Sequence, residues 1–217
     1  MTPSPKAKMD ILDFHTHRLD AKGALISVDP RNFDPQPGLW YSVGFHPWDD
    51  VITLTDDDFN LLERCARHPQ VLAIGETGMD ALRGGDLVTQ ADVLIRHLEL
   101  AHDLGKPVVV HNVRCTQEIL AARRQAGPAT VTLAIHGMRG NEHVARTLLD
   151  AGCYLSYGAR FNPEALRSTP LDRLLIETDD ASVNIQEVAD AVAAVLQVSR
   201  DHVTKTAAGN AQRLLIK

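Results

Sequence analysis

Two histidines separated by one residue stand at the end of the first apolar run, in the segment Asp13-Phe14-His15-Thr16-His17. If this segment is a strand, its side chains alternate between two faces, so Asp13, His15 and His17 point the same way. Imidazole is the most common metal ligand, and two imidazoles on one face can reach the same ion. The spacing therefore predicts part of a metal site, with an ordinary polar strand end as the alternative.

Four more residues of metal-ligand type occupy the same structural place, directly after short apolar runs. They are Glu76, His111, His136 and Asp179. One histidine behind an apolar strand is usually structural, but six such residues at corresponding positions indicate a shared function. Carboxylates among neutral imidazoles are costly to desolvate unless cations compensate them. Four histidines and two carboxylates exceed what one open catalytic ion needs, so the set predicts two divalent ions with Glu76 as a bridge.

The segments that position these residues alternate between apolar strands and amphipathic helices. We expect strands at 11–17, 24–28, 40–45, 71–76, 107–111, 130–136, 153–157 and 173–177. We expect helices from Thr55 onward, at 89–104, 116–125, 141–151, after Pro163, at 185–197 and at 208–216. Eight alternating βα units with short loops predict an α/β fold of the (β/α)8 TIM-barrel type.

The candidate ligands all fall at C-terminal strand ends, which is where barrels of this type keep their catalytic residues. The first two units leave too little chain for full crossover helices. We therefore expect reduced first two crossover helices and a barrel that is distorted or partly open on that side.

The composition is that of an ordinary globular protein, with 217 residues, 44% of them hydrophobic and 23% charged. We expect one domain over residues 10–217, preceded by a disordered tail at 1–9, and we expect a monomer. The net charge of −6 argues against a large basic nucleic-acid footprint, although bound cations would reverse the local sign. The sequence has no apolar run of about 18 residues, so we expect no membrane partner. Three scattered cysteines predict reduced thiols in the cytoplasm.

The motifs around the candidate ligands resemble those of the TatD family of metal-dependent deoxyribonucleases, within the amidohydrolase-like barrels. The resemblance runs from about Asp10 to the C-terminus. Its motifs are 13–17, Gly44-Phe45-His46-Pro47, 73–80, 107–111, 135–137, 155–158, 175–179 and Asn210 before 213–214. The resemblance implies that the ligands divide between two metals. One metal would be held by His15, His17 and Asp179, the other by His111 and His136, with Glu76 bridging both.

The ligand set and the resemblance together predict an enzyme that hydrolyses DNA phosphodiester bonds with a water activated by two divalent ions. We expect Asp179 and Glu76 to be catalytic, with Asp179 both a ligand and the acceptor of the proton from water. Arg114 and Arg139 lie just past two ligand-bearing strands and are expected to hold phosphate oxygens, with surface salt bridges as the alternative.

Three further residues are expected to support the site. His46, in a rigid turn after the third strand, is expected to contact substrate or to support the ligands from behind, with simple packing as the alternative. Glu177 and Asp13 are expected to orient the ligands from behind.

Two other functions remain compatible with the sequence. One is a metal-dependent hydrolase of a small phosphoester, ester, lactone or amide, because one barrel supports many chemistries and the net charge is acidic. The other is a non-catalytic metal-binding protein, which the complete ligand set disfavours. Mixed histidine and carboxylate ligands allow Zn, Mn, Co or Mg.

Overall fold

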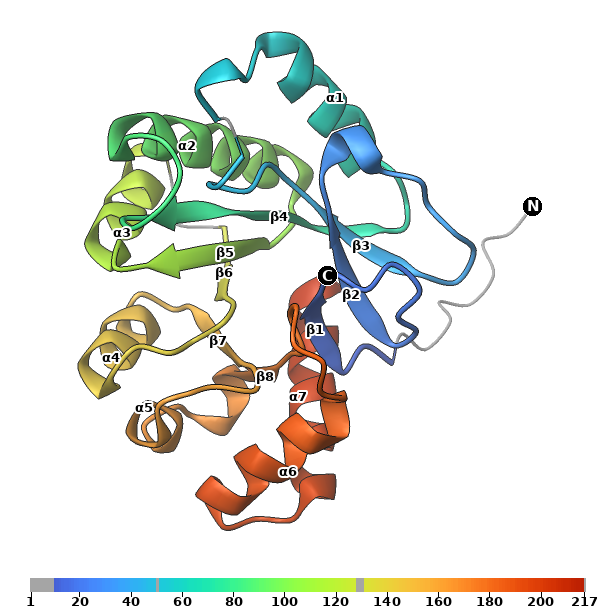
Figure 1. Cartoon of the computed structure of the whole chain (residues 1–217), viewed down its shortest axis with the longest axis vertical. Helices are drawn as coiled ribbons and strands as arrows, with labels where there is room; N and C mark the ends of the chain where they lie inside the picture. The colour runs from blue at the N-terminus through green and yellow to red at the C-terminus, as the bar shows by residue number, and fades with distance from the viewer. Residues whose placement is uncertain (1–9, 50, 128–130, 217) are drawn as a thin grey trace.

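The computed structural model describes residues 10–49, 51–127 and 131–216, so the expected disordered tail at 1–9 lies outside the described residues. Eight parallel strands in this part of the chain close into a barrel in sequential order, which confirms the predicted TIM-type fold (Figure 1). The strands are β1 (Asp13–Thr16), β2 (Ala24–Val28), β3 (Trp40–Val43), β4 (Val71–Asp80), β5 (Val108–Val113), β6 (Leu133–Ile135), β7 (Tyr154–Tyr157) and β8 (Leu174–Ile176).

The α-helices of the described chain begin only after β3. They are α1 (Asp56–Ala66), α2 (Leu87–Leu104), α3 (Thr116–Gln125), α4 (Glu142–Asp150), α5 (Pro163–Arg167), α6 (Ile185–Leu196) and α7 (Arg200–Leu215). Short 3-10 turns lie at η1 (Pro30–Asn32), η2 (Val51–Thr53) and η3 (Leu171–Arg173). Between β1 and β3 the described chain has β2 and the short turn η1 but no α-helix, so the reduced first two crossovers are confirmed.

The barrel is closed at the side where the sequence left an opening possible. Asp13 on β1 pairs with Ala24 on β2 and with Ile176 on β8. A further bridge joins Thr16 to Asp179, just past β8. The barrel is therefore closed although its first two crossovers are short.

Two helices begin earlier than the sequence pattern predicted, because polar caps precede their apolar stripes. The Asp86 carboxylate accepts hydrogen bonds from the backbone of Val88 and Thr89, so α2 begins at Leu87 instead of residue 89. Ser199 caps α7 at Arg200, eight residues before the predicted start, because the first half of this helix is mostly polar. No helix among the described residues is long and apolar enough to cross a lipid bilayer.

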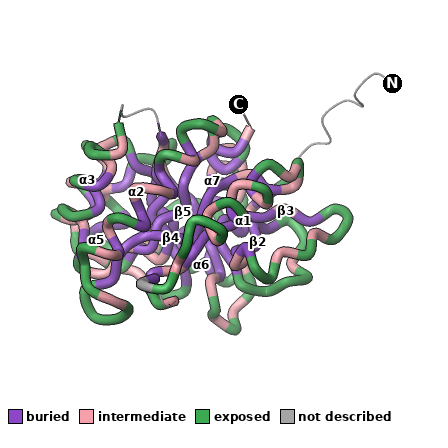
Figure 2. The backbone as a smooth tube through the Cα atoms, turned by 90° about the horizontal axis from the view of Figure 1, so that it is seen from above, coloured by how far each residue is buried: buried purple, intermediate pink, exposed green. Residues whose placement is uncertain are grey.

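Apolar side chains pack on both faces of the sheet. The larger cluster joins outward strand residues such as Val108 and Val110 to the surrounding helices. The smaller cluster takes the alternate residues, Val109 among them, and fills the barrel interior together with Ala211 and Leu214 of α7. Figure 2 shows the buried backbone concentrated in the centre of the molecule. The barrel interior is therefore filled by side chains. The C-terminal strand ends remain available for a functional site.

His97 on α2 is a buried histidine that holds the end of β3 in place. Its Nε2 accepts a hydrogen bond from the backbone amide of Phe45 at 3.0 Å, so its Nδ1 carries the hydrogen donated to the carbonyl of Val93 at 2.8 Å. Burial lowers the pKa of His97 to about 4. The folded protein therefore keeps this imidazole neutral at pH values where the unfolded chain protonates it.

We expect His97 to make the protein less stable as the pH falls from 6.5 toward 4. In this interval the unfolded chain binds a proton that the folded protein does not bind, and the pKa difference corresponds to a loss of roughly 3 kcal/mol. Urea unfolding between pH 4.5 and 7.5 measures this dependence. The His97→Gln protein should be less stable at pH 7 but should lose less stability on acidification. An equal pH dependence of stability in both proteins would contradict the lowered pKa of His97.

Candidate metal centre

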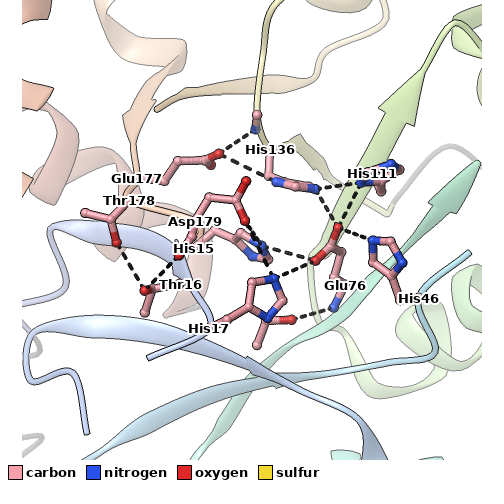
Figure 3. A network of polar contacts seen from close by, with 12 residues as sticks. His15, Thr16, His17, His46, Glu76, His111, His136, Glu177, Thr178 and Asp179 are labelled. Carbon is pink, nitrogen blue, oxygen red and sulfur yellow. Dashed lines mark hydrogen bonds and ion pairs between the residues drawn. The ribbon is translucent and has the colours of Figure 1, made fainter. Parts of the chain in front are cut away.

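Glu76 on β4 lies at the centre of the site, and only 3% of its surface is exposed. Its Oε2 lies 3.2 Å from His15 Nε2 and 3.3 Å from His17 Nε2. Both imidazoles come from the end of β1. The Asp179 Oδ1, from the turn after β8, lies 3.6 Å from each of these nitrogens. Figure 3 shows the three side chains converging on this side of Glu76.

The other carboxylate oxygen of Glu76 faces a second group of histidines. Its Oε1 lies 2.7 Å from His136 Nε2 and 3.0 Å from His111 Nδ1. His46 Nε2 also lies 2.8 Å from this oxygen (Figure 3). The two oxygens thus divide the surrounding histidines into two groups, which is the arrangement expected around a bridging carboxylate.

His46 lies deeper in this arrangement than the sequence suggested. Its ring nitrogen is as close to Glu76 as those of His111 and His136. One ligand atom each from His46, Glu76 and His111 fall within 4.8 Å of one another, close enough to share an ion. Its place at a strand end was the available signal, but the sequence did not indicate that the turn aims the ring inward.

Several polar atoms of the centre have no hydrogen-bond partner although they are buried. Both ring nitrogens of His15 and the Oε2 of Glu76 are in this state. Buried polar atoms without partners are costly in a folded protein, and a cation removes that cost. The donor set of imidazole nitrogens and carboxylate oxygens suits divalent transition metals. The residues therefore fit the metal ions that the sequence predicted.

The electrostatics of the centre agree with this donor set. Burial alone would raise the pKa of Glu76, but the imidazoles of His136, His15 and His111 outweigh burial and hold it well below its ordinary value. Burial would lower the pKa of His136, yet Glu76 and Glu177 raise it well above the usual range. The adjacent Glu76 carboxylate likewise raises the pKa of His17. In the absence of metal, protons would supply the positive charge that the carboxylates attract.

Two carboxylates lie behind the rings of His111 and His136. His111 Nε2 lies 3.2 Å from Asp80 Oδ2, while its other nitrogen faces Glu76. The Nδ1 of His136 lies 3.5 Å from Glu177 Oε1, which also accepts a hydrogen bond from the backbone of Gly137. Such partners fix the tautomer and orientation of an imidazole ligand. Asp80 is a residue that sequence reasoning missed, although the 73–80 motif contains it.

Asp13 lies behind the centre, where its carboxylate contacts Thr178. It accepts hydrogen bonds from the backbone amide and the hydroxyl of Thr178, at 2.8 Å and 2.6 Å. Burial raises the pKa of Asp13. Because Thr178 directly precedes Asp179, these bonds fix the turn that presents the Asp179 carboxylate.

Two adjacent cavities open at this end of the barrel. The metal cavity, about 380 Å³, is lined by residues that include His17, His46, Trp48, Glu76, His111 and Asp179. The side cavity, about 480 Å³, is lined by residues that include Gly137, Arg139, Arg160, Glu177 and Asp179. Both cavities also share Asp180. Of the two arginines predicted to bind phosphate, Arg139 lines the side cavity, whereas Arg114 is exposed and lines neither.

Comparison with known proteins identifies the family. A family model described as TatD related DNase matches residues 32–216. An uncharacterized metal-dependent hydrolase of Bacillus subtilis, YabD, is 26% identical over 197 residues, which cover 81% of this chain and 77% of that protein. An uncharacterized metal-dependent hydrolase of Mycobacterium tuberculosis, TatD, is 34% identical over 154 residues. That match covers 65% of this chain and only 58% of the M. tuberculosis protein.

The fold comparison gives the same result at lower sequence similarity. The crystal structure of YjjV, a TatD homologue from Escherichia coli K12, superposes with a TM-score of 0.80 at 20% identity, covering 96% of this chain and 99% of that chain. This likeness supports the barrel fold alone. Together with the family match over residues 32–216, it confirms the resemblance seen in the sequence. The chain belongs to the TatD family, whose relatives compared above are named metal-dependent hydrolases.

Proposed function

We propose that this TatD-family protein hydrolyses phosphodiester bonds of DNA with two divalent metal ions at the candidate centre. The observation that carries this proposal is the division of five histidines between the two oxygens of one buried carboxylate, Glu76. One ion would be held by His15, His17 and Asp179, and the other by His111 and His136 with His46 beside them. Bound ions there would lower the pKa of a water molecule and stabilise negative charge on phosphoryl oxygens.

The residues of this chain have separate tasks in that reaction. Asp179 is partly exposed to both cavities, so its carboxylate is placed to accept the proton from an attacking water. Asp80 and Glu177 keep His111 and His136 oriented, with one ring nitrogen of each directed at Glu76. Asp13 holds the turn before Asp179 through Thr178.

The side cavity supports a substrate that extends beyond the reacting phosphate. Arg139 and Arg160 are both exposed and line it, directly next to Asp179. Arginine forms bidentate hydrogen bonds with phosphate oxygens, so the two side chains are suited to a neighbouring phosphate of a nucleic-acid strand. They bring two positive charges to a cavity whose lining also includes the carboxylates of Glu177, Asp179 and Asp180.

A metal-dependent hydrolase of a small ester, lactone or amide is the second candidate. The size of the metal cavity favours it, because about 380 Å³ lies in the usual range for small-molecule sites. The acidic net charge points in the same direction.

The test combines metal analysis with substrate comparison. We expect elemental analysis to find close to two metals per chain, drawn from Zn, Mn, Co or Mg, and labelled single-stranded DNA to be cleaved only without chelator. Two bound metals without DNA cleavage, together with turnover of a small ester or lactone, would favour the second candidate. A protein that binds no metal even when metal is in excess would contradict the proposed function.

A further inference from the structure

Trp48 stands at the mouth of the metal cavity with 48% of its surface exposed. Its ring meets the rings of His46 and His111 edge to face, with centroids 4.8 Å and 5.4 Å away. An indole in this position leaves a large apolar surface in water, and tryptophan is enriched at interaction surfaces. The indole therefore lies directly beside two histidines of the candidate metal centre with much of its surface available to a ligand.

The indole is held in one orientation. Its Nε1 donates a 2.6 Å hydrogen bond to Asp80 Oδ2, the oxygen that also contacts His111. The other oxygen of Asp80 accepts hydrogen bonds from the backbone amides of Leu82 and Arg83. One buried carboxylate thus fixes the tryptophan, a histidine of the metal centre and the start of the loop after β4.

The rest of that loop is also fixed against the segment that carries Trp48. The buried Gln90 side chain donates to the carbonyls of Asp80, Arg83 and Gly85. Gly84 has a φ of +82°, and a Cβ there would lie 2.1 Å from the carbonyl oxygen of Pro47. Only glycine permits this close approach. A loop containing two consecutive glycines is therefore held rigidly beside Trp48.

The loop places a cation on the indole. The guanidinium carbon of the exposed Arg83 lies 4.5 Å from the centroid of the Trp48 ring. A guanidinium plane stacks on aromatic rings and also binds phosphate oxygens. Trp48 and Arg83 thus form a preorganised pair of planar groups at the edge of the metal cavity, which we call the stacking pair.

We propose that the stacking pair binds a nucleobase of the substrate next to the phosphate at the metal centre. Aromatic rings and arginine planes are the groups on which proteins stack unpaired bases, since every base has a π-face. A base inside a duplex is covered on both faces by its neighbours, so the substrate class is single-stranded nucleic acid or an end with an unpaired base. This inference rests on the proposed function, because it places the base beside a phosphate held at the candidate metal centre.

The test compares two ligands that differ only in the base, deoxyadenosine 5′-monophosphate and 2-deoxyribose 5-phosphate. The metal-loaded Trp40→Phe protein is used, because the chain has two tryptophans and this variant leaves Trp48 as the only one. We expect the nucleotide to quench Trp48 fluorescence and to bind about 5- to 150-fold more tightly than the sugar phosphate, the range that stacking one base supplies.

Variants of Trp48 and Arg83 test whether the stacking pair causes the preference for the nucleotide. In the otherwise native chain, calorimetry should show that Trp48→Ala loses the preference for the nucleotide, Arg83→Ala reduces it and Trp48→Phe retains most of it. Leu171→Ala, which removes another exposed apolar side chain at η3, is the matched control and should keep the preference. Equal affinity for both ligands, or a preference that survives in Trp48→Ala, would overturn the inference.

The same experiment separates this inference from the proposed function. If the protein cleaves DNA but binds both ligands equally, the nuclease proposal stands and the stacking proposal is wrong. If the protein shows the Trp48-dependent preference but cleaves no DNA, the stacking proposal stands and the nuclease proposal is wrong. If Trp48→Ala fails to fold, the comparison between Trp48→Phe and Arg83→Ala and the fluorescence of the Trp40→Phe protein still decide the result.

Discussion

Replacing Asp179 with asparagine is expected to lower the rate of DNA hydrolysis by about 10²- to 10⁴-fold, the range associated with a general base. Its Oδ1 lies 3.6 Å from the Nε2 atoms of both His15 and His17, and the side chain opens onto both cavities. An amide in the same position keeps the shape but cannot take up a proton at neutral pH. The substitution would therefore remove the proposed proton acceptor and one proposed anionic ligand together.

Asparagine is also the substitution that best preserves the backbone at this position. Asp179 has a φ of +53°, in the left-handed region that asparagine and aspartate adopt more readily than other non-glycine residues. Its amide donates to the carbonyl of His15 at 2.8 Å, and its own carbonyl accepts from the amide of His17. These bonds join the turn after β8 to the end of β1 and do not involve the carboxylate, so without metal the variant should unfold at nearly the temperature of the metal-free native protein.

Asp180 provides the matched control. It is exposed, lines both cavities and carries the same charge, but it belongs to none of the candidate metal groups of the described residues. Asp180→Asn should keep activity within about tenfold of the native value by the usual small effect of an exposed charge. Steady-state cleavage of labelled single-stranded DNA at saturating metal measures both variants. Native-like activity in Asp179→Asn, or equal losses in both, would contradict the role of Asp179.

The predictable part of the site follows from strand periodicity. On β5, β6 and β8 a buried apolar residue lies two positions before a polar residue of the site, as in Val109 and His111 or Ala134 and His136. Because side chains alternate with period two, the polar residue continues the interior face of the barrel toward its C-terminal end. The fold and the convergence of the predicted ligands could therefore be derived from short apolar runs and the residue that ends each.

The less predictable part depends on features that periodicity does not describe. The pairing register shifts between Asp13 and Thr16 on β1 and between Ile74 and Thr77 on β4. Such irregularities redirect side chains near active sites, and a sequence pattern with period two contains no sign of them. On β1, Asp13 bonds to Thr178 instead of joining the two histidines of its own segment at Glu76.

Loop conformation accounts for the remaining differences. Arg114 follows β5 as Arg139 follows β6, but Arg114 has a φ of +58° and lines neither cavity. Asp80 acquires its role only because β4 continues past Glu76 for four more residues, which brings it to His111. Neither outcome follows from residue type, because both depend on where a strand ends and how the next turn bends.

Removing the metal ions is expected to lower the unfolding temperature on the order of 10 °C. A ligand present at 1,000 times its dissociation constant stabilises the folded protein by about 4 kcal/mol, and 1 kcal/mol corresponds to about 2–4 °C in a protein of this size. In this protein the stabilisation has a structural origin, because His15 and Glu76 bury polar atoms without hydrogen-bond partners. A bound cation satisfies these atoms, whereas its removal leaves them desolvated.

The effect of metal removal should increase with pH. In the metal-free protein the pKa values of His17 and His136 are raised, so protonation stabilises the folded form below about pH 6.5. That stabilisation is lost as the pH rises through the folded-state pKa values. Metal binding changes in the opposite direction, because imidazole must be neutral to act as a ligand. The difference between loaded and chelated protein is therefore expected to be larger at pH 8 than at pH 6.

Thermal unfolding with and without chelator at pH 6 and pH 8 measures this prediction, and added metal should restore the loaded value. The Glu76→Gln protein is the control, since it lacks the carboxylate that both groups of histidines face and should respond little to chelator. An unfolding temperature that is the same with and without chelator at both pH values would mean that Glu76 and its histidines form a polar network that binds no metal. A shift that is larger at pH 6 than at pH 8 would mean that imidazoles are not the principal ligands.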